Sequence, residues 1–382
     1  TCSQLPMSAS IAPWPDRPCR FAVISDLHVA LPHTVWDHPS RFHLVEVAIP
    51  SLEQILERLE LLDLDFLLLP GDLTQHGEPE NHEWLVKRLS QLSYPVYVVP
   101  GNHDFPPLSS YPRITTLPEF VELYRDFGYG DSGQPYYIQE LLPGLKLIGL
   151  NSNQLSEDGR EIIGAIDPVQ MDWLDRTLAD LHPDDLTIVM VHHNVVEHLP
   201  EQSRHPLGCR YMLQNAIDLR QKLRSAGIQL VFTGHLHVQD IAEADGLYDI
   251  TTGSLVSYPH PFRLVTLRRD RAGQVWLEVD SGRVKSIPGW DDLPSISREW
   301  MGDRSPPFML KMLMAGGLGL SHDEAVMLAP QLRNFWADVA NGDTVFDFAQ
   351  LPPIVRDYCQ QFGAIGPDGS IARIDNHIAL RL

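Results

Sequence analysis

Five short segments of this chain gather side chains that bind metal ions and transfer protons, and each directly follows an apolar run. They are Asp26-Leu27-His28, Gly71-Asp72, Gly101-Asn102-His103-Asp104, His192-His193 and Gly234-His235-Leu236-His237. Imidazole and carboxylate groups without a thiolate suit divalent first-row metals. The candidate groups exceed the needs of one four- to six-coordinate ion, so the pattern favours two ions that share a carboxylate. Such a pair, about 3.5–4 Å apart, could clamp a phosphoryl group and hold a bridging hydroxide.

The apolar runs before these segments have the length and composition of buried β-strands. The predicted strands are Phe21–Ile24, Phe66–Leu69, Val96–Val99, Leu145–Leu150, Thr187–Val191 and Ile228–Phe232. Loops at the strand ends of an open α/β sheet point into one crevice. We therefore expect the five segments to converge there, although they are far apart in the sequence.

Amphipathic stretches between the strands predict helices that flank the sheet. Ser51–Gln54 matches a capping box, and Asp167–Gln170 combines a cap, an N1 proline and a second box. Met212–Ala226 is predicted to form a helix that ends at Gly227. Antiparallel hairpins are expected at Leu247–Thr252, Leu264–Arg268 and Val275–Val279, so the sheet should be mixed.

The composition changes near residue 286, where strand patterns give way to helical ones. The expected divisions are an extended lead-in at 1–19, a catalytic domain at 20–285 and a mostly helical C-terminal extension at 286–382. In the extension, Ser321 and Glu324 form a capping box, and Pro330 must kink or divide the following helix. Its apolar helix faces need cover, so we expect the extension to pack on the catalytic domain or on a partner subunit of a homo-oligomer.

The ordered set of segments resembles the calcineurin-like metallophosphoesterase superfamily over roughly residues 20–285. Within it, the Gly101-Asn102-His103-Asp104 version is most similar to class III cyclic-nucleotide phosphodiesterases and glycerophosphodiesterases. The resemblance implies an α/β fold, an αββα sandwich of mixed sheets, here followed by an α-helical extension. It also implies two bound metal ions, and Fe, Mn, Zn and Co would all accept these ligands.

The resemblance implies a role for each residue of the segments. It makes Asp26, His28 and His237 ligands of the first ion, Asp72 the carboxylate that bridges both, and Asn102, His192 and His235 ligands of the second. It makes Asp72 and His103 the catalytic residues, with His103 orienting the phosphate or protonating the leaving oxygen. Asn102, His103 and His193 are the expected substrate contacts. A hydroxide between the ions would attack phosphorus in line, so no separate protein base is required.

One departure from the superfamily bears on the substrate. Protein phosphatases of the superfamily carry Gly-Asp-x-x-Asp-Arg-Gly, whereas Gln75 and His76 stand here in place of the second aspartate and the arginine. Loss of a phosphate-gripping arginine disfavours a protein phosphatase and favours a diester over a monoester. The leading prediction is a phosphodiesterase for small diesters, cyclic nucleotides such as cAMP first. Glycerophosphodiester hydrolysis, phosphomonoester or nucleotide pyrophosphate hydrolysis, and a non-catalytic metal-binding scaffold are the alternatives.

Several further residues have a simpler structural interpretation than a catalytic one. The loop histidines His33, His38 and His43 could line the substrate entrance but are more simply solvated, and the same holds for His198. His76 and His82 are expected on the surface. Phe335 and Trp336 are expected to pack in the extension rather than to form a nucleobase platform.

Composition narrows the class of partner and the compartment. The 382 residues carry a formal net charge of −21, which disfavours binding to nucleic acid or to an anionic membrane surface. Four scattered cysteines without a C-x-x-C motif favour free thiols in a reducing compartment. No signal peptide is visible and no apolar run is long enough to cross a bilayer, so we expect a cytoplasmic protein.

Overall fold

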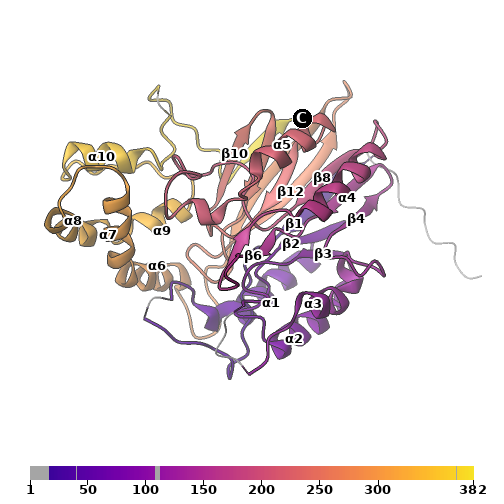
Figure 1. Ribbon diagram of the computed structural model, residues 1–382, viewed down its shortest axis with the longest axis horizontal. Helices are drawn as coiled ribbons and strands as arrows, with labels where there is room; N and C mark the ends of the chain where they lie inside the picture. The colour runs from indigo at the N-terminus through magenta and orange to yellow at the C-terminus, as the bar shows by residue number, and fades with distance from the viewer. Residues whose placement is uncertain (1–16, 40, 108–111, 367) are drawn as a thin grey trace, which may run out of the picture.

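Two six-stranded β-sheets form the centre of the computed structural model, which describes residues 17–39, 41–107, 112–366 and 368–382 (Figure 1). The first sheet has the order β14 (Ile378–Arg381), β13 (Val275–Arg283), β12 (Pro261–Arg269), β1 (Cys19–Val23), β2 (Phe66–Pro70) and β3 (Val96–Val99). β1, β2 and β3 run parallel, whereas β12, β13 and β14 extend the sheet as an antiparallel ladder from β1. The predicted mixed sheet is confirmed. Residues 1–16 of the predicted lead-in lie outside the described residues.

The second sheet is also mixed. Its order is β10 (Asp240–Ala244), β11 (Leu247–Thr251), β9 (Leu230–Thr233), β8 (Leu186–Met190), β5 (Leu145–Gly149) and β4 (Tyr137–Leu142). The strands from β11 through β9 and β8 to β5 are parallel, and β10 and β4 are antiparallel edges. A separate ribbon pairs β6 (Asn153–Leu155) with β7 (Ile162–Gly164).

Aromatic side chains join the two sheets. The ring of Phe21 on β1 stacks on Phe66 of β2 at 4.6 Å and meets the edge of Phe232 on β9 at 5.5 Å. Side chains on β9 alternate between the two faces of the second sheet: Phe232 belongs to the core between the sheets, and Val231 belongs to the core under the outer helices. Burial on both faces explains why the central strands are continuous apolar runs.

Helices cover the outer face of each sheet and complete the predicted αββα sandwich (Figure 1). On the first sheet lie α1 (Ala48–Glu60), α2 (Pro79–Leu89) and α3 (Leu117–Leu123), and on the second lie α4 (Pro168–Ala179) and α5 (Ala216–Ser225). Short 3₁₀ turns occupy η1 (Val45–Val47), η2 (Arg125–Phe127) and η3 (Cys209–Tyr211). Among the described residues, no helix is long and apolar enough to cross a membrane.

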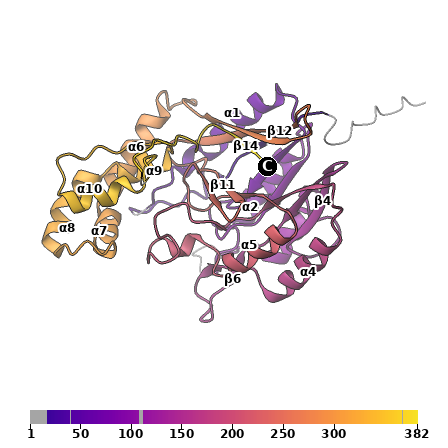
Figure 2. The same cartoon turned by 90° about the horizontal axis from the view of Figure 1, so that it is seen from above.

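The C-terminal extension is a helical layer at one end of the sandwich, and both views place it there (Figures 1 and 2). It comprises α6 (Leu293–Arg304), α7 (Pro306–Ala315), α8 (His322–Leu328), η4 (Ala329–Leu332), α9 (Phe335–Ala340) and α10 (Pro353–Gln360). Ser321 and Glu324 form the expected capping box, and the chain passes from α-helix to 3₁₀ turn at Pro330 as expected. Its apolar core includes Leu236 and Val238 of the sandwich, which confirms that it packs on the catalytic region.

Local predictions failed where tertiary contacts override sequence preference. β14 was missed because residues 378–381 form a short strand on the edge of the first sheet. Ser51 lies inside α1 rather than capping it, since the helix already begins at Ala48. The Gln170 side chain bonds the backbone of Asn151 instead of closing a capping box. Residues 212–215 are not helical, because Met212 and Leu213 pair with Asn194.

Candidate metal centre

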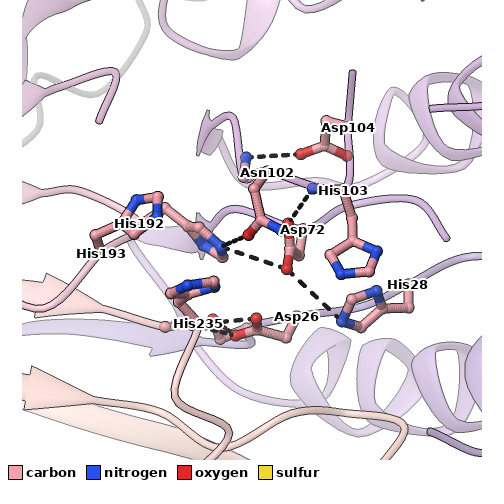
Figure 3. Close-up of polar contacts among 12 residues, drawn as sticks. Asp26, His28, Asp72, Asn102, His103, Asp104, His192, His193 and His235 are labelled. Carbon is pink, nitrogen blue, oxygen red and sulfur yellow. Dashed lines mark hydrogen bonds and ion pairs between the residues drawn. The ribbon is translucent and has the colours of Figure 1, made fainter. Parts of the chain in front are cut away.

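The five predicted segments converge on one edge of the sandwich, at the ends of strands β1, β2, β3, β8 and β9 (Figure 3). Backbone hydrogen bonds tie the first two loops together: the amide of Asp26 donates to Gly71 O at 3.2 Å, and that of His28 donates to Asp72 O at 3.0 Å. The convergence therefore follows from the parallel order of the strands and from direct loop-to-loop contacts.

The backbone of these loops is held in an unusual conformation. Asp26, His28, Asp72, His235 and His237 all have positive φ, between 43° and 67°. L-residues other than glycine adopt this left-handed region rarely and at a cost, so such residues persist where surrounding structure enforces them, often at functional sites. Five such residues lie within the candidate ligand segments. Because this conformation costs folding free energy, its concentration at this edge indicates a functional site.

Glycines in the segments let the backbone approach the carboxylates of Asp26 and Asp72 more closely than any side chain would permit. A Cβ on Gly101 would lie 2.2 Å from both the amide nitrogen and Oδ1 of Asp72. A Cβ on Gly234 would lie 2.1 Å from Ser25 Oγ and 2.5 Å from Asp26 Oδ2. These glycines let the backbone pack directly against the two carboxylates, which gives a physical reason for their place in the motifs.

The first cluster contains Asp26, His28, Asp72 and His237, with one ligand atom of each within 4.8 Å of the others. Nε2 of His237 lies 3.1 Å from Asp26 Oδ1 and 3.4 Å from Nε2 of His28. Nε2 of His28 lies 3.8 Å from Asp72 Oδ2. Two imidazole nitrogens and two carboxylates that converge in this way can hold a divalent cation.

The second cluster shares Asp72 with the first and adds His192 and His235. The same Oδ2 of Asp72 lies 3.3 Å from Nε2 of His192, and that nitrogen lies 3.2 Å from Asn102 Oδ1 (Figure 3). His235 directs Nε2 towards the carbonyl of Arg210 at 3.3 Å, which leaves Nδ1 available to an ion. One carboxylate oxygen thus faces both clusters, which is one of the two ways in which a carboxylate can bridge neighbouring ions.

Surrounding groups orient the candidate ligands. Nδ1–H of His192 donates to Pro70 O at 2.8 Å, and Asp72 Oδ1 accepts the amide of His103 at 2.8 Å, so Oδ2 remains directed at the clusters. Asp26 accepts the amide of His235 at 3.1 Å on both of its oxygens. Such contacts fix the tautomer and orientation of metal ligands.

The electrostatics of the donor set also suit cations. Burial and the neighbouring imidazole of His43 hold the pKa of His28 well below its usual value, so this ring is neutral and can ligate. Burial opposes the charged form of His192, but Asp72 outweighs burial and raises the pKa of His192 to about 9. The Asp72 carboxylate therefore favours positive charge at this position. Buried carboxylates and imidazoles in this arrangement therefore fit metal ions.

His103 lies beside the clusters and belongs to neither. Its Nδ1–H donates to the backbone carbonyl of Gln75 at 2.8 Å, and its ring meets that of His28 edge-on at 4.7 Å. The side chain of Gln75 instead bonds Thr34 O and Glu78. The main chain at residue 75, rather than the side chain of Gln75, therefore orients His103.

Asp104 and His193 are buried beside the candidate ligands and contact the residues around them. Asp104 accepts the amides of Leu73, Thr74 and Gly101, which ties two ligand loops together. His193 is buried, its Nδ1 shares a hydrogen bond with Ser152 Oγ at 2.8 Å, and its ring lies 4.4 Å from that of His235 in a tilted arrangement. It does not line the hollow in front of the clusters, so its predicted contact with substrate has no support from this geometry.

One residue of the centre was missed. His43, expected on a solvated loop, lies with its ring 4.6 Å from that of His28 and 4.5 Å from that of His237, and its nitrogen joins theirs in a possible ligand group. Its presence among three histidines after the Asp26-x-His28 segment was the available signal. His33 remains on the surface near Glu80.

Three other histidines, expected on the surface or on a solvated loop, are more buried than predicted. His82 was expected on the surface but is fully buried, with Nδ1 2.9 Å from the Tyr124 hydroxyl. His76 is partly buried and stacks on His103 at 5.3 Å. His198 does not line the hollow; its buried ring pairs with Asp240 and Asp249.

A hollow of about 510 Å³ opens in front of the clusters. Its polar lining includes Asp72, Asn102, His103, His235 and His237. Arg160 and Arg210 are its guanidinium groups, and Met301 and Trp336 of the C-terminal extension also line it. The arrangement places candidate metal ligands, the imidazole of His103 and two cationic side chains around a space large enough for a small molecule.

Comparison with known proteins identifies the relationship. The model of the calcineurin-like phosphoesterase family matches residues 19–239. A 3′,5′-cyclic-nucleotide phosphodiesterase of Nostoc sp. is 30% identical over 190 residues, or 49% of this chain and 62% of the relative. A 3′,5′-cyclic adenosine monophosphate phosphodiesterase, CpdA of Haemophilus influenzae, is 26% identical over 233 residues, or 60% of this chain and 76% of the relative. The chain thus spans less than two thirds of the Nostoc relative.

A probable glycerophosphodiester phosphodiesterase, GpdQ of Arcobacter nitrofigilis, is 27% identical over 143 residues, or 36% of this chain and 46% of the relative. Among solved structures, a dimetal phosphatase from Danio rerio superposes with a TM-score of 0.51 at 15% identity, covering 70% of this chain and 96% of the other. That likeness shows the fold.

Proposed function

Because the chain belongs to the calcineurin-like phosphoesterase family, we propose that it is a dinuclear metal-dependent phosphodiesterase for small diesters, with 3′,5′-cyclic nucleotides such as cAMP preferred. The observation that carries the proposal is the position of Asp72 Oδ2, 3.8 Å from Nε2 of His28 and 3.3 Å from Nε2 of His192. The cyclic-nucleotide phosphodiesterases among the relatives favour this substrate class.

The residues that would hold the ions follow from the two clusters. Asp26, His28 and His237 would hold one ion, Asn102, His192 and His235 the other, and Asp72 both. When bound, the pair would polarise the phosphoryl oxygens and lower the pKa of a water molecule between the ions, which supplies the nucleophile. The identity of the metals follows availability more than this ligand set.

His103 is the residue proposed to handle the leaving-group proton. The hydrogen bond from its Nδ1–H to Gln75 O leaves Nε2 free, and the residue lines the hollow. An imidazole held in this way can orient a phosphoryl oxygen or carry a proton to the departing oxygen. The Asn102 amide group, which also lines the hollow, can donate to the phosphoryl group while Oδ1 faces His192.

The charge around the hollow supports a diester over a monoester. Among the described residues, no arginine side chain makes a hydrogen bond or ion pair with a candidate ligand; the Arg210 guanidinium bonds the Tyr211 hydroxyl, and the side chain of Gln75 bonds Thr34 O and Glu78. Arg160 and Arg210 lie on the wall of the hollow and are exposed. A monoester dianion is usually gripped by a bidentate guanidinium at the phosphate, whereas a diester monoanion needs less compensation.

Hydrolysis by the metal-loaded chain tests the proposal. Bis(4-nitrophenyl) phosphate, 4-nitrophenyl phosphate, cAMP and glycerophosphocholine would be compared for wild type, Asp72→Ala and the control Asp131→Ala, whose carboxylate is 91% exposed. We expect diester turnover, fastest on cAMP among the natural esters, lost in Asp72→Ala and kept in the control. Faster turnover of the monoester would replace the proposal with a phosphatase, and faster turnover of glycerophosphocholine would replace the preferred substrate.

A further inference from the structure

We propose that the C-terminal extension completes the substrate pocket, with Trp336 as a flat wall against which the planar organic group of a phosphodiester stacks. The inference rests on the proposed phosphodiesterase function and specifies its substrate class. Trp336 was expected to serve packing alone. The same was expected of Phe335, which is buried in the core of the extension. Trp336, in contrast, is half-buried and lines the hollow.

The hollow is lined by residues of two chemical kinds. Beside the candidate metal ligands, its lining includes the apolar and aromatic side chains Phe42, Tyr211, Leu236, Met301 and Trp336. Tyr211 belongs near both kinds, since its ring lies 5.0 Å from that of His235. A ligand held by its phosphate at the candidate metal ligands could therefore place its organic group against apolar lining. An apolar pocket with a few convergent polar groups is the usual form of a small-molecule site.

The extension is fixed against the loop that carries His43. Nε1–H of Trp300 donates to the carbonyl of Arg41 at 3.2 Å, and the Arg41 guanidinium lies 5.4 Å from the Trp300 ring centre. Phe42 meets the edge of Phe308 at 6.1 Å. These contacts join α6 and α7 to the loop between β1 and α1. The extension therefore packs directly against the loop that carries His28 and His43.

Trp336 itself is held in place. Its ring meets Phe308 at 5.3 Å, and Arg298 on α6 makes an ion pair with Asp338 on the same helix as Trp336 at 2.8 Å. Leu236, between the candidate ligands His235 and His237, belongs to the apolar core of the extension. The loop that carries His235 and His237 and the helix α9 that carries Trp336 share this core. Packing therefore fixes the distance between the candidate metal ligands and Trp336.

The chemistry of a fixed indole face selects planar groups. Stacking of a nucleobase on an aromatic side chain is worth roughly 5- to 150-fold in binding per base. A neutral glycerol substituent has neither a flat face nor a positive charge and gains little from it. The wall therefore favours a nucleoside cyclic phosphate over a glycerophosphodiester, a distinction that the metal ligands cannot make.

The test compares Trp336→Leu, which keeps apolar volume without the flat ring, with Trp336→Phe and with Met327→Ala, an exposed residue of the same extension at 66% exposure. Steady-state kinetics would be measured with cAMP and with glycerophosphoglycerol, whose substituents are neither planar nor positively charged, in the metal-loaded chain. For Trp336→Leu we expect KM for cAMP to rise about 5- to 150-fold, with less than a twofold change for glycerophosphoglycerol. The Phe variant should recover most of the loss, and Met327→Ala should match wild type.

Equal loss on both substrates, or no loss on cAMP, would overturn the inference. Binding of a hydrolysis-resistant cAMP phosphorothioate, measured by calorimetry, separates this inference from the proposed function. If wild type turns over no diester, the proposed function fails, yet weaker binding by Trp336→Leu than by Trp336→Phe still supports the aromatic wall. Equal binding by the two variants would refute it.

Discussion

Replacement of His103 by alanine should reveal whether this residue is the proton donor to the leaving oxygen. Its ring is outside both ligand clusters, and its Nδ1 is occupied by Gln75 O, so the substitution removes an open imidazole nitrogen without removing a metal ligand. A positioned general acid contributes about 10²–10⁴-fold, or about 2.7–5.5 kcal/mol of activation free energy. That contribution depends on how much the leaving oxygen needs a proton.

The assay measures kcat of wild type and His103→Ala on cAMP and on bis(4-nitrophenyl) phosphate, with metal content determined for both proteins. We expect a loss of about 10²–10⁴-fold on cAMP, whose leaving group is an alkoxide, and of about tenfold or less on the nitrophenyl ester, whose phenolate departs unaided. Replacement of the stacked His76 by alanine serves as the control for packing around His103. An equal loss on both substrates would refute general acid catalysis and indicate that His103 positions the phosphate.

Three further perturbations test other parts of the structure. Gly101→Ala would bring a Cβ within 2.2 Å of Asp72 and should displace its carboxylate. We therefore expect kcat to fall by at least about 10²-fold. Wild-type activity of this variant would show that the loop relaxes to accept the methyl group. Removing the ions with a chelator should abolish turnover and lower Tm, since ions at 100 times Kd stabilise by about 2.7 kcal/mol; an unchanged Tm in differential scanning calorimetry would contradict folded-state binding. Burial opposes the charge of His198, but Asp249 and Asp240 raise its pKa to about 10, above its usual 6.5, so its stabilising effect should be full below pH 6.5 and lost as pH rises through 10. Denaturant unfolding of metal-free His198→Gln against wild type should show a difference of about 3–5 kcal/mol at pH 6 that shrinks by pH 10; a constant difference would exclude the ion pairs as its source.

Local sequence signals predicted the central strands and the place of the ligand segments, because each segment follows a strand buried on both faces. Such strands are continuous apolar runs, as in Phe66–Pro70, and their order along the chain determines which loops meet. The motif residues Asp72 and His103 could be located in this way. Their separate roles as ligand and proton donor stay predictions.

Features that depend on distant contacts could not be read from the sequence. His43 reaches the centre because its loop packs under the extension through Arg41 and Trp300, a contact across more than 250 residues. His82 is buried because Tyr124 and Thr74 satisfy its ring nitrogens. No local sequence pattern predicts such distant partners. For the same reason, the position of Trp336 beside the hollow could not be predicted from the sequence.

Metal content per chain tests the dinuclear centre most directly. Wild type, Asp72→Ala, His192→Ala and Asp131→Ala would be loaded, freed of excess metal and analysed by mass spectrometry together with protein quantification. Because one oxygen of Asp72 faces both clusters, we predict about two ions in wild type and in Asp131→Ala, a loss from both sites in Asp72→Ala, and a loss from one site in His192→Ala. A single ion in wild type, or two ions retained by Asp72→Ala, would contradict the shared carboxylate.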